Sequence, residues 1–151
     1  MLAIDGKVAL VTGATRGIGK AIALQLASQG AVVIGTATSD SGAQSITEAL
    51  KGAGNAGMGM VLNVSSAESV DATLKAIVEA FGAPTILVNN AGITKFNAHG
   101  NLAGLEKDDF FNIYGVNVVG PYQMIRAAEK ALRASQDAAV VNVASIAGVQ
   151  G

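Results

Sequence analysis

The chain of 151 residues contains no cysteine and no tryptophan. Without cysteine it can form neither a disulfide framework nor a thiolate metal site. His99 is the only histidine, so we expect an exposed loop residue there and no bound metal. No run of 18 apolar residues is present, and the first residues do not combine a basic region with an apolar one. The sequence therefore predicts neither a membrane span nor a signal peptide, and it indicates a cytoplasmic protein.

The chain also lacks an excess of charge of either sign, because its net charge is −1 at pH 7. This balance gives no electrostatic reason to expect nucleic acid or an anionic membrane surface as a partner. Half of the residues are apolar and 19 are glycine, which is typical of a globular, turn-rich chain and not of a disordered one. We expect a single domain over residues 1–151, since a chain of this length can bury about 70% of its unfolded surface.

Apolar runs alternate with helical patterns along the chain. This order is typical of an α/β fold, a doubly wound parallel sheet with helices on both faces. The strands that we expect are Val8–Val11, Val32–Gly35, Gly59–Leu62, Ile86–Val88 and Ala139–Val143. The helices that we expect are Gly17–Gln29, Gly42–Gly52, Ala67–Phe81 and Ile113–Ala134, with a shorter one at Leu105–Phe110.

A glycine-rich turn joins the first expected strand to the first expected helix. It reads Thr12-Gly13-Ala14-Thr15-Arg16-Gly17-Ile18-Gly19, and its Gly-x-x-x-Gly-x-Gly spacing is one residue wider at the front than Gly-x-Gly-x-x-Gly. Backbone N–H groups and the positive end of the helix dipole converge at such a turn, and glycines let a pyrophosphate approach closely. The turn predicts a phosphate site. The alternative is a tight strand-to-helix turn that binds nothing.

Further polar residues follow the later strands. Asn89-Asn90-Ala91-Gly92 comes after the fourth strand, at the carboxyl end where open α/β sheets bind ligands. Asn117 lies within the long expected helix, although asparagine is a poor helix former. Ser145 ends the fifth strand. Each residue alone has an ordinary structural explanation, but their order along a βαβ pattern favours one common site.

On these residues the chain resembles the short-chain dehydrogenase/reductase family over essentially its whole length. The likeness is carried by Gly13, Gly17, Gly19, Asn63, Val64, Asn90, Ala91, Gly92, Asn117 and Ser145. Up to about Thr94 the chain looks most like bacterial 3-oxoacyl-acyl-carrier-protein reductases, and this closer likeness fades after Lys95. The resemblance implies a Rossmann-type sheet of five strands in the order 3-2-1-4-5, lacking the last two strands of the family, and a homo-oligomer.

The resemblance also implies a nicotinamide nucleotide and the residues that hold it: Gly13, Thr15, Arg16, Gly17, Ile18, Gly19, Thr38, Asn63, Val64, Asn90, Ala91 and Gly92. Sheets specific for NAD usually carry Asp or Glu at the end of the second strand, where this chain has Ala37. Arg16, with Thr15 and Thr38, offers a guanidinium and two hydroxyls to a 2′-phosphate. We therefore expect NADP(H). The alternatives are that Arg16 is a solvated turn residue, or that Asp40 binds the ribose.

The family's reaction is hydride transfer between the nucleotide and a carbonyl, here a ketone or a 3-oxoacyl thioester. By resemblance Ser145 orients the carbonyl and Asn117 sustains a water-linked proton relay. The family's Tyr-x-x-x-Lys pair is expected beyond Gly151. Arg126 and not lysine follows Tyr122 by four residues, and we expect Tyr114 and Tyr122 to have packing or interface roles.

Three functions stay open at this point. The chain is the nucleotide-binding part of a carbonyl reductase, or it is a catalytically silent nucleotide-binding or scaffolding half-domain. The third possibility is a structural protein with no nucleotide site. In all cases we expect the valine-rich edge of the fifth strand and the helix Ile113–Ala134 to promote self-association.

Overall fold

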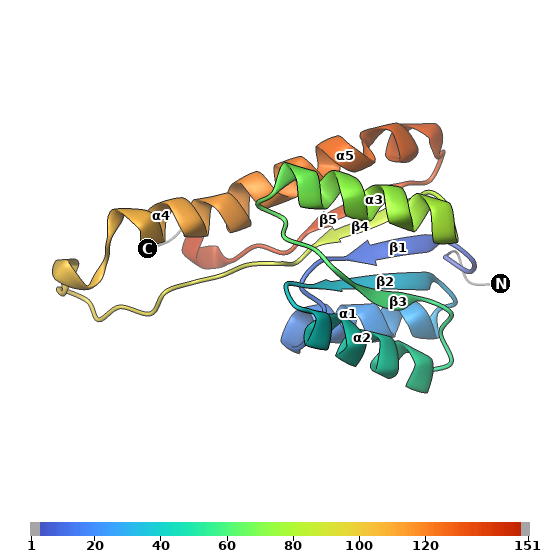
Figure 1. Ribbon diagram of the computed structural model, residues 1–151, viewed down its shortest axis with the longest axis horizontal. Helices are drawn as coiled ribbons and strands as arrows, with labels where there is room; N and C mark the ends of the chain where they lie inside the picture. Colours follow the sequence, from blue (N-terminus) through green and yellow to red (C-terminus); the bar gives the residue numbers. More distant parts are fainter. Residues whose placement is uncertain (1–3, 149–151) are drawn as a thin grey trace.

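A computed structural model describes residues 4–148 of the chain. Five parallel strands form one sheet in the order β3-β2-β1-β4-β5 (Figure 1). The strands are β1 (Val8–Val11), β2 (Val32–Ala37), β3 (Met58–Val61), β4 (Ile86–Asn89) and β5 (Ala139–Asn142). The predicted fold class and strand order are confirmed.

Helices cover both faces of the sheet (Figure 1). One face carries α1 (Gly17–Ser28) and α2 (Asp40–Gly52), and the other carries α3 (Ala67–Phe81) and α5 (Gly120–Ala134). None of the helices described within residues 4–148 is long and apolar enough to cross a membrane.

The core consists of two apolar layers, one on each face of the sheet. Along β1, Val8 and Leu10 join the layer that contains Met124 of α5, whereas Ala9 and Val11 join the opposite layer. Successive side chains of a strand point to opposite faces, so a strand that is covered on both faces must be apolar at every position. This explains why β1 reads as a continuous apolar run and not as an alternating one.

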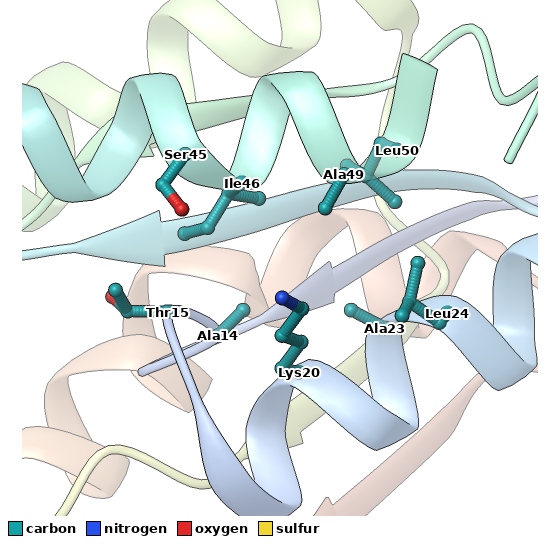
Figure 2. Close-up of a pocket in the computed structure, with 9 residues that line it drawn as sticks. All are labelled: Ala14, Thr15, Lys20, Ala23, Leu24, Ser45, Ile46, Ala49 and Leu50. Carbon is teal, nitrogen blue, oxygen red and sulfur yellow. The ribbon is translucent and has the colours of Figure 1, made fainter. Parts of the chain in front are cut away.

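The helices α1 and α2 lie close together on their face of the sheet. Figure 2 shows Lys20, Ala23 and Leu24 of α1 opposite Ser45, Ile46, Ala49 and Leu50 of α2. The space left between these side chains is about 10 Å³, which is close to the minimum for one water molecule. This pocket is therefore a packing gap and not a ligand site.

The segment after β4 differs from the sequence prediction. Instead of two separate helices, a continuous helical run comprises α4 (Lys107–Tyr114), a π-helical segment (Gly115–Val119) and α5. Neither glycine nor proline lies between Phe110 and Ile113, so nothing interrupts the helix where a break was expected. α4 also begins two residues later than predicted, at Lys107.

Several other boundaries shift by one or two residues. β2 continues to Ala37 because Thr36 and Ala37 still pair with β3. β3 is displaced by one residue toward the N-terminus, β4 gains Asn89 and β5 ends at Asn142. α1 ends one residue early, at Ser28. α2 starts at Asp40, since the Ser39 side chain accepts a hydrogen bond from the Gly42 amide at 3.2 Å and caps the helix.

Candidate functional site

An open cleft of about 580 Å³ lies at the carboxyl ends of β1 to β4. The strand order reverses direction at β1, between β2 and β4, which is the place where open α/β sheets bind ligands. All twelve residues predicted to hold a nucleotide line this cleft: Gly13, Thr15, Arg16, Gly17, Ile18, Gly19, Thr38, Asn63, Val64, Asn90, Ala91 and Gly92. The fold thus brings together residues that are far apart in the sequence.

The three glycines of the turn serve different purposes. A Cβ atom on Gly19 would overlap the carbonyl oxygen of Gly13 and the side-chain amide of Asn90, and one on Gly13 would lie 2.9 Å from the Cα atom of Ala91. Both residues are therefore required by the packing of the protein itself. Gly17 has a φ angle of +56° and nothing within 4 Å of an added Cβ. The space beside Gly17 is thus open at the N-terminus of α1.

Thr12 ties the end of β4 to the end of β1. Its hydroxyl oxygen accepts hydrogen bonds from the backbone amides of Asn90 at 3.0 Å and Ala91 at 2.9 Å. In return, the Asn90 side-chain amide donates to the carbonyl oxygens of Thr12 and Gly13, both at 3.0 Å. Thr12 is almost fully buried. Sequence reasoning missed its role, although a hydroxyl at the end of an apolar strand was a usable signal.

Asn117 lies in the π-helical segment and holds the chain that follows β4. Its carboxamide oxygen accepts a hydrogen bond from the Ile93 amide at 2.8 Å, and its nitrogen donates to the Ile93 carbonyl at 2.9 Å. Ile93 lines the cleft. These two hydrogen bonds to the backbone of Ile93 explain why asparagine, a poor helix former, occupies a helical position.

Hydrogen bonds hold the part of the cleft lining that follows β3, which contains Asn63 and Val64. The Asn63 carboxamide oxygen accepts hydrogen bonds from the Ser65 amide at 3.1 Å and from the Ser65 hydroxyl at 2.7 Å, which forms a tight turn after β3. Gln123 of α5 is buried and donates from Nε2 to the Val64 carbonyl at 2.8 Å. Sequence reasoning also missed Gln123, whose only signal is a polar residue on the apolar face of α5.

Arg16 and Asp40 differ in their relation to the cleft. Arg16 precedes α1, is exposed and lines the cleft. Within residues 4–148 it takes part in no ion pair. Asp40 is the first residue of α2 and does not line the cleft. The geometry favours Arg16 as the residue that meets a charged group of a ligand.

Ser145 follows β5 and lies outside the lining of the cleft. It is exposed, and its Oγ accepts a hydrogen bond from the Ala147 amide at 3.2 Å, which opens the short helix Ile146–Gly148. Upstream, the Asn89 side-chain amide donates to Asn142 Oδ1 at 2.9 Å. This bond links the ends of β4 and β5, the strands that precede Asn90 and Ser145.

An ion pair anchors the long connection between β4 and α4. Lys95 Nζ lies 2.6 Å from Asp109 Oδ2, and the same carboxylate accepts a hydrogen bond from the Glu106 amide at 2.8 Å. The hydrogen bond from Lys95, followed by that from Glu106, holds the pKa of Asp109 below its ordinary value. The Asp109 carboxylate thus links Lys95 in the connection to the N-terminus of α4.

Comparison with known proteins agrees with this geometry. The chain matches the short chain dehydrogenase family over residues 7–151. It is 47% identical over 150 residues to the 3-oxoacyl-acyl-carrier-protein reductase of Pseudomonas aeruginosa and 47% identical over 148 residues to that of Vibrio cholerae. The enzyme of Escherichia coli is 41% identical over 147 residues. The expected loss of likeness after Lys95 does not end the alignments, which continue far beyond that residue.

These matches cover 97–99% of the chain. The chain spans 60% of the length of the Pseudomonas aeruginosa relative and 58% of the other two. Because the family match includes both the glycine turn and the segment around Ser145, it extends to every part of the candidate site. The chain therefore belongs to the short-chain dehydrogenase family.

Proposed function

We propose that residues 1–151 form one dinucleotide-binding domain that holds NADP(H) in the cleft. In this proposal the domain is the nucleotide-binding part of a carbonyl reductase that acts on a ketone or a 3-oxoacyl thioester. The observation that carries it is the convergence of twelve predicted residues on one cleft, at the point where the strand order reverses. The names of the relatives support a 3-oxoacyl thioester as the substrate class.

The residues present fit a dinucleotide phosphate. The N-terminus of α1 and the open space beside Gly17 suit a pyrophosphate, because the free N–H groups of a helix end attract anions. Arg16, Thr15 and Thr38 are exposed and line the same cleft. A guanidinium can bind a 2′-phosphate through two parallel hydrogen bonds, which explains the proposed preference for NADP(H) over NAD(H).

Two further residues act on the substrate and on the chain that follows β4: Ser145 and Asn117. When bound, the reduced nucleotide supplies the hydride that reaches the carbonyl carbon. Ser145 donates a hydrogen bond from Oγ to the carbonyl oxygen, since the contact with Ala147 uses Oγ only as an acceptor. Both polar atoms of the Asn117 side chain are bonded to Ile93. We therefore propose that Asn117 contributes to the proton relay indirectly. Its side chain holds the Ile93 backbone, which lines the cleft.

A catalytically silent nucleotide-binding module is the second candidate. Among residues 1–151, no tyrosine is followed by lysine four positions later. Reduction of a carbonyl needs a proton donor at the developing alkoxide. Neither Tyr114 nor Tyr122 has the required lysine.

A two-step experiment separates these functions. NADPH is titrated into the purified 151-residue chain and followed by nucleotide fluorescence, and a 3-oxoacyl thioester is then added. The same titrations and assays are made with the chain extended through the remaining length of its relatives. Binding in both proteins with turnover in the longer one supports the reductase, whereas binding without turnover in either supports the silent module. Absence of binding at millimolar NADPH would contradict both.

A further inference from the structure

A groove lies between α3 and α5, away from the nucleotide cleft. Figure 1 shows these two helices side by side, and their residues are in contact. The groove has a volume of about 590 Å³, and small-molecule sites are clefts of about 300–1,000 Å³. It lies toward the amino ends of the strands, because Ala83 and Pro84, which precede β4, belong to its lining. None of its lining residues lines the nucleotide cleft.

The lining of the groove is mainly aliphatic. Eight of its twelve lining residues are apolar, and five of these are alanines. On α3, Leu74 is almost fully buried, whereas Val78, one helical turn later, is 47% exposed. Because α5 contributes only alanines and Lys130 to the lining, no large apolar side chain fills the space opposite Leu74 and Val78. Within residues 4–148, the groove is therefore an apolar surface that the chain itself leaves uncovered.

The residue types of the lining exclude a polar ligand body. The lining contains no neutral polar side chain and no aromatic ring. A peptide strand or a sugar would bring polar groups that lose water without gaining hydrogen-bond partners. A nucleobase would find no aromatic ring on which to stack. The groove therefore suits an alkyl chain.

The charges beside the groove determine the head group. Four charged residues belong to the lining: Asp71, Lys75, Glu79 and Lys130. Arg126 lies 3.6 Å from Asp71, and Lys75 lies 4.0 Å from Glu79. In the described part of the chain, Lys130 takes part in no ion pair. With Arg126 included, three positive charges face two negative ones, so Lys130 is the cation that is left for an anionic head group.

We propose that the groove binds a free fatty carboxylate, with its alkyl chain along Leu74 and Val78 and its head group at Lys130. The alkyl chain leaves water as it covers the exposed part of Val78, and the ammonium group of Lys130 donates a charge-assisted hydrogen bond to the carboxylate. The ligand is a molecule in solution and not a membrane lipid, because Asp71 and Glu79 beside the groove disfavour an anionic bilayer surface. The proposal does not depend on nucleotide binding, since the two sites share no residue.

Methyl NMR tests the location of the site. Dodecanoate is titrated into the full chain below the concentration at which it forms micelles, and the methyl signals of Leu74 and Val78 are followed. Both signals should shift and reach saturation. The methyl signals of Ile18, which lines the nucleotide cleft, are the control and should not move. Shifts without saturation, or equal shifts at Ile18, would overturn the proposal.

A ligand series tests the chemistry of the groove by calorimetric titration. Decanoate should bind about tenfold more weakly than dodecanoate, because two fewer methylene groups leave water. Dodecyltrimethylammonium has the same chain with a positive head group and should bind at least about tenfold more weakly, because it meets the like charge of Lys130. Equal affinity for the cationic compound would disprove the head-group assignment. Binding to vesicles with anionic lipids but not to dodecanoate would disprove a free ligand.

Substitutions test the residues themselves. Ala131→Leu fills the groove and should weaken dodecanoate binding by at least about tenfold, whereas Ala80→Leu on α3 lies outside the lining and should not. Lys130→Glu should weaken binding by about fivefold. Lys51→Glu makes the same charge change on α2 and is its control. Circular dichroism checks folding, and Ala134→Leu is the second filling variant. Folded filling variants that bind dodecanoate like the parent chain would overturn the proposal.

Discussion

The hydroxyl oxygen of Thr12 and the backbone of Asn90 are joined across the two central strands, and the Asn90 side chain returns the contact to the Thr12 carbonyl. This reciprocal arrangement fixes the end of β4 against the glycine turn. Thr12 is 1% exposed, so water cannot easily replace its hydroxyl. The shape of the cleft therefore depends on a residue that need not touch any ligand.

Replacing Thr12 by valine should destabilise the protein by about 2–6 kcal/mol, because two partly buried N–H groups lose their acceptor at a cost of about 1–3 kcal/mol each. Urea denaturation measures this change. Thr12→Ser is the matched control, since it keeps the hydroxyl and removes only a methyl group, which costs about 1 kcal/mol. Equal stability of Thr12→Val and the parent chain would contradict the role of the hydroxyl.

Replacing Arg16 by alanine should weaken NADPH binding selectively. We expect a loss of about 1–3 kcal/mol for NADPH, the range for hydrogen bonds to a charged group, and little change for NADH. Fluorescence titration of both nucleotides measures the difference. Arg16→Lys should recover part of the affinity, because it keeps the charge but not the planar fork. Equal losses for NADPH and NADH would show that Arg16 does not read the 2′-phosphate.

Replacing Asn117 by leucine should loosen the wall of the cleft at Ile93. The Ile93 amide then loses its acceptor, so its hydrogen exchange should accelerate, and NADPH affinity should fall by about 0.5–1.5 kcal/mol. Asn117→Asp is the control, because it keeps an acceptor for the Ile93 amide and loses only the donor to the Ile93 carbonyl. Unchanged exchange in Asn117→Leu would rule out this positional role.

The connection anchored by Lys95 should respond to acid in a defined direction. The pKa of Asp109 is lower in the folded chain than its ordinary value, chiefly because of the hydrogen bond from Lys95. The stabilisation is therefore complete above the ordinary carboxyl pKa and is lost as the pH falls through the lowered one. Carbon NMR of the Asp109 carboxyl measures the midpoint. Lys95→Met should move it upward, and an unchanged midpoint would contradict the ion pair.

The purified 151-residue chain should bind NADPH and still oxidise none of it in the presence of a 3-oxoacyl thioester, because no suitable proton donor accompanies Ser145. Absorbance at the nucleotide band measures turnover, and intact mass confirms the chain. Ser145→Ala should leave NADPH affinity unchanged. Robust NADPH oxidation by this chain would require another donor, and Tyr122→Phe would be the first variant to test.

The sequence was sufficient for features that depend on local patterns. Apolar runs and the glycine turn predicted the parallel sheet and a phosphate site at Gly13, since both faces of the sheet and the turn impose strict demands on residue type. The strand order and the full set of residues around the cleft came from the resemblance to the short-chain dehydrogenase/reductase family. It was insufficient where a contact between distant residues decides the outcome. Nothing near Gln123 in the sequence indicates that it reaches Val64, and nothing near Asn117 indicates Ile93.

Gly19 illustrates the same limit. The pattern predicts a glycine that makes room for a ligand, yet a side chain there would first meet the carbonyl of Gly13 and the amide of Asn90. The helix boundary at Phe110 was wrong for a related reason. Propensity alone could not show that α4 would continue into a π-helical segment whose Asn117 is held by Ile93.

The π-helical segment Gly115–Val119 also determines how far the side chains of α4 are rotated around the helix axis relative to those of α5. In an uninterrupted α-helix, the eight residues from Tyr114 to Tyr122 would turn these side chains about 80° apart. The wider turn absorbs one residue and brings them back to nearly the same direction. Deleting one residue of this segment would therefore rotate the whole of α4 by about 100° while α5 kept its place on the sheet. A change in chain length by a single residue would alter the outer surface of this protein more than any single substitution on it.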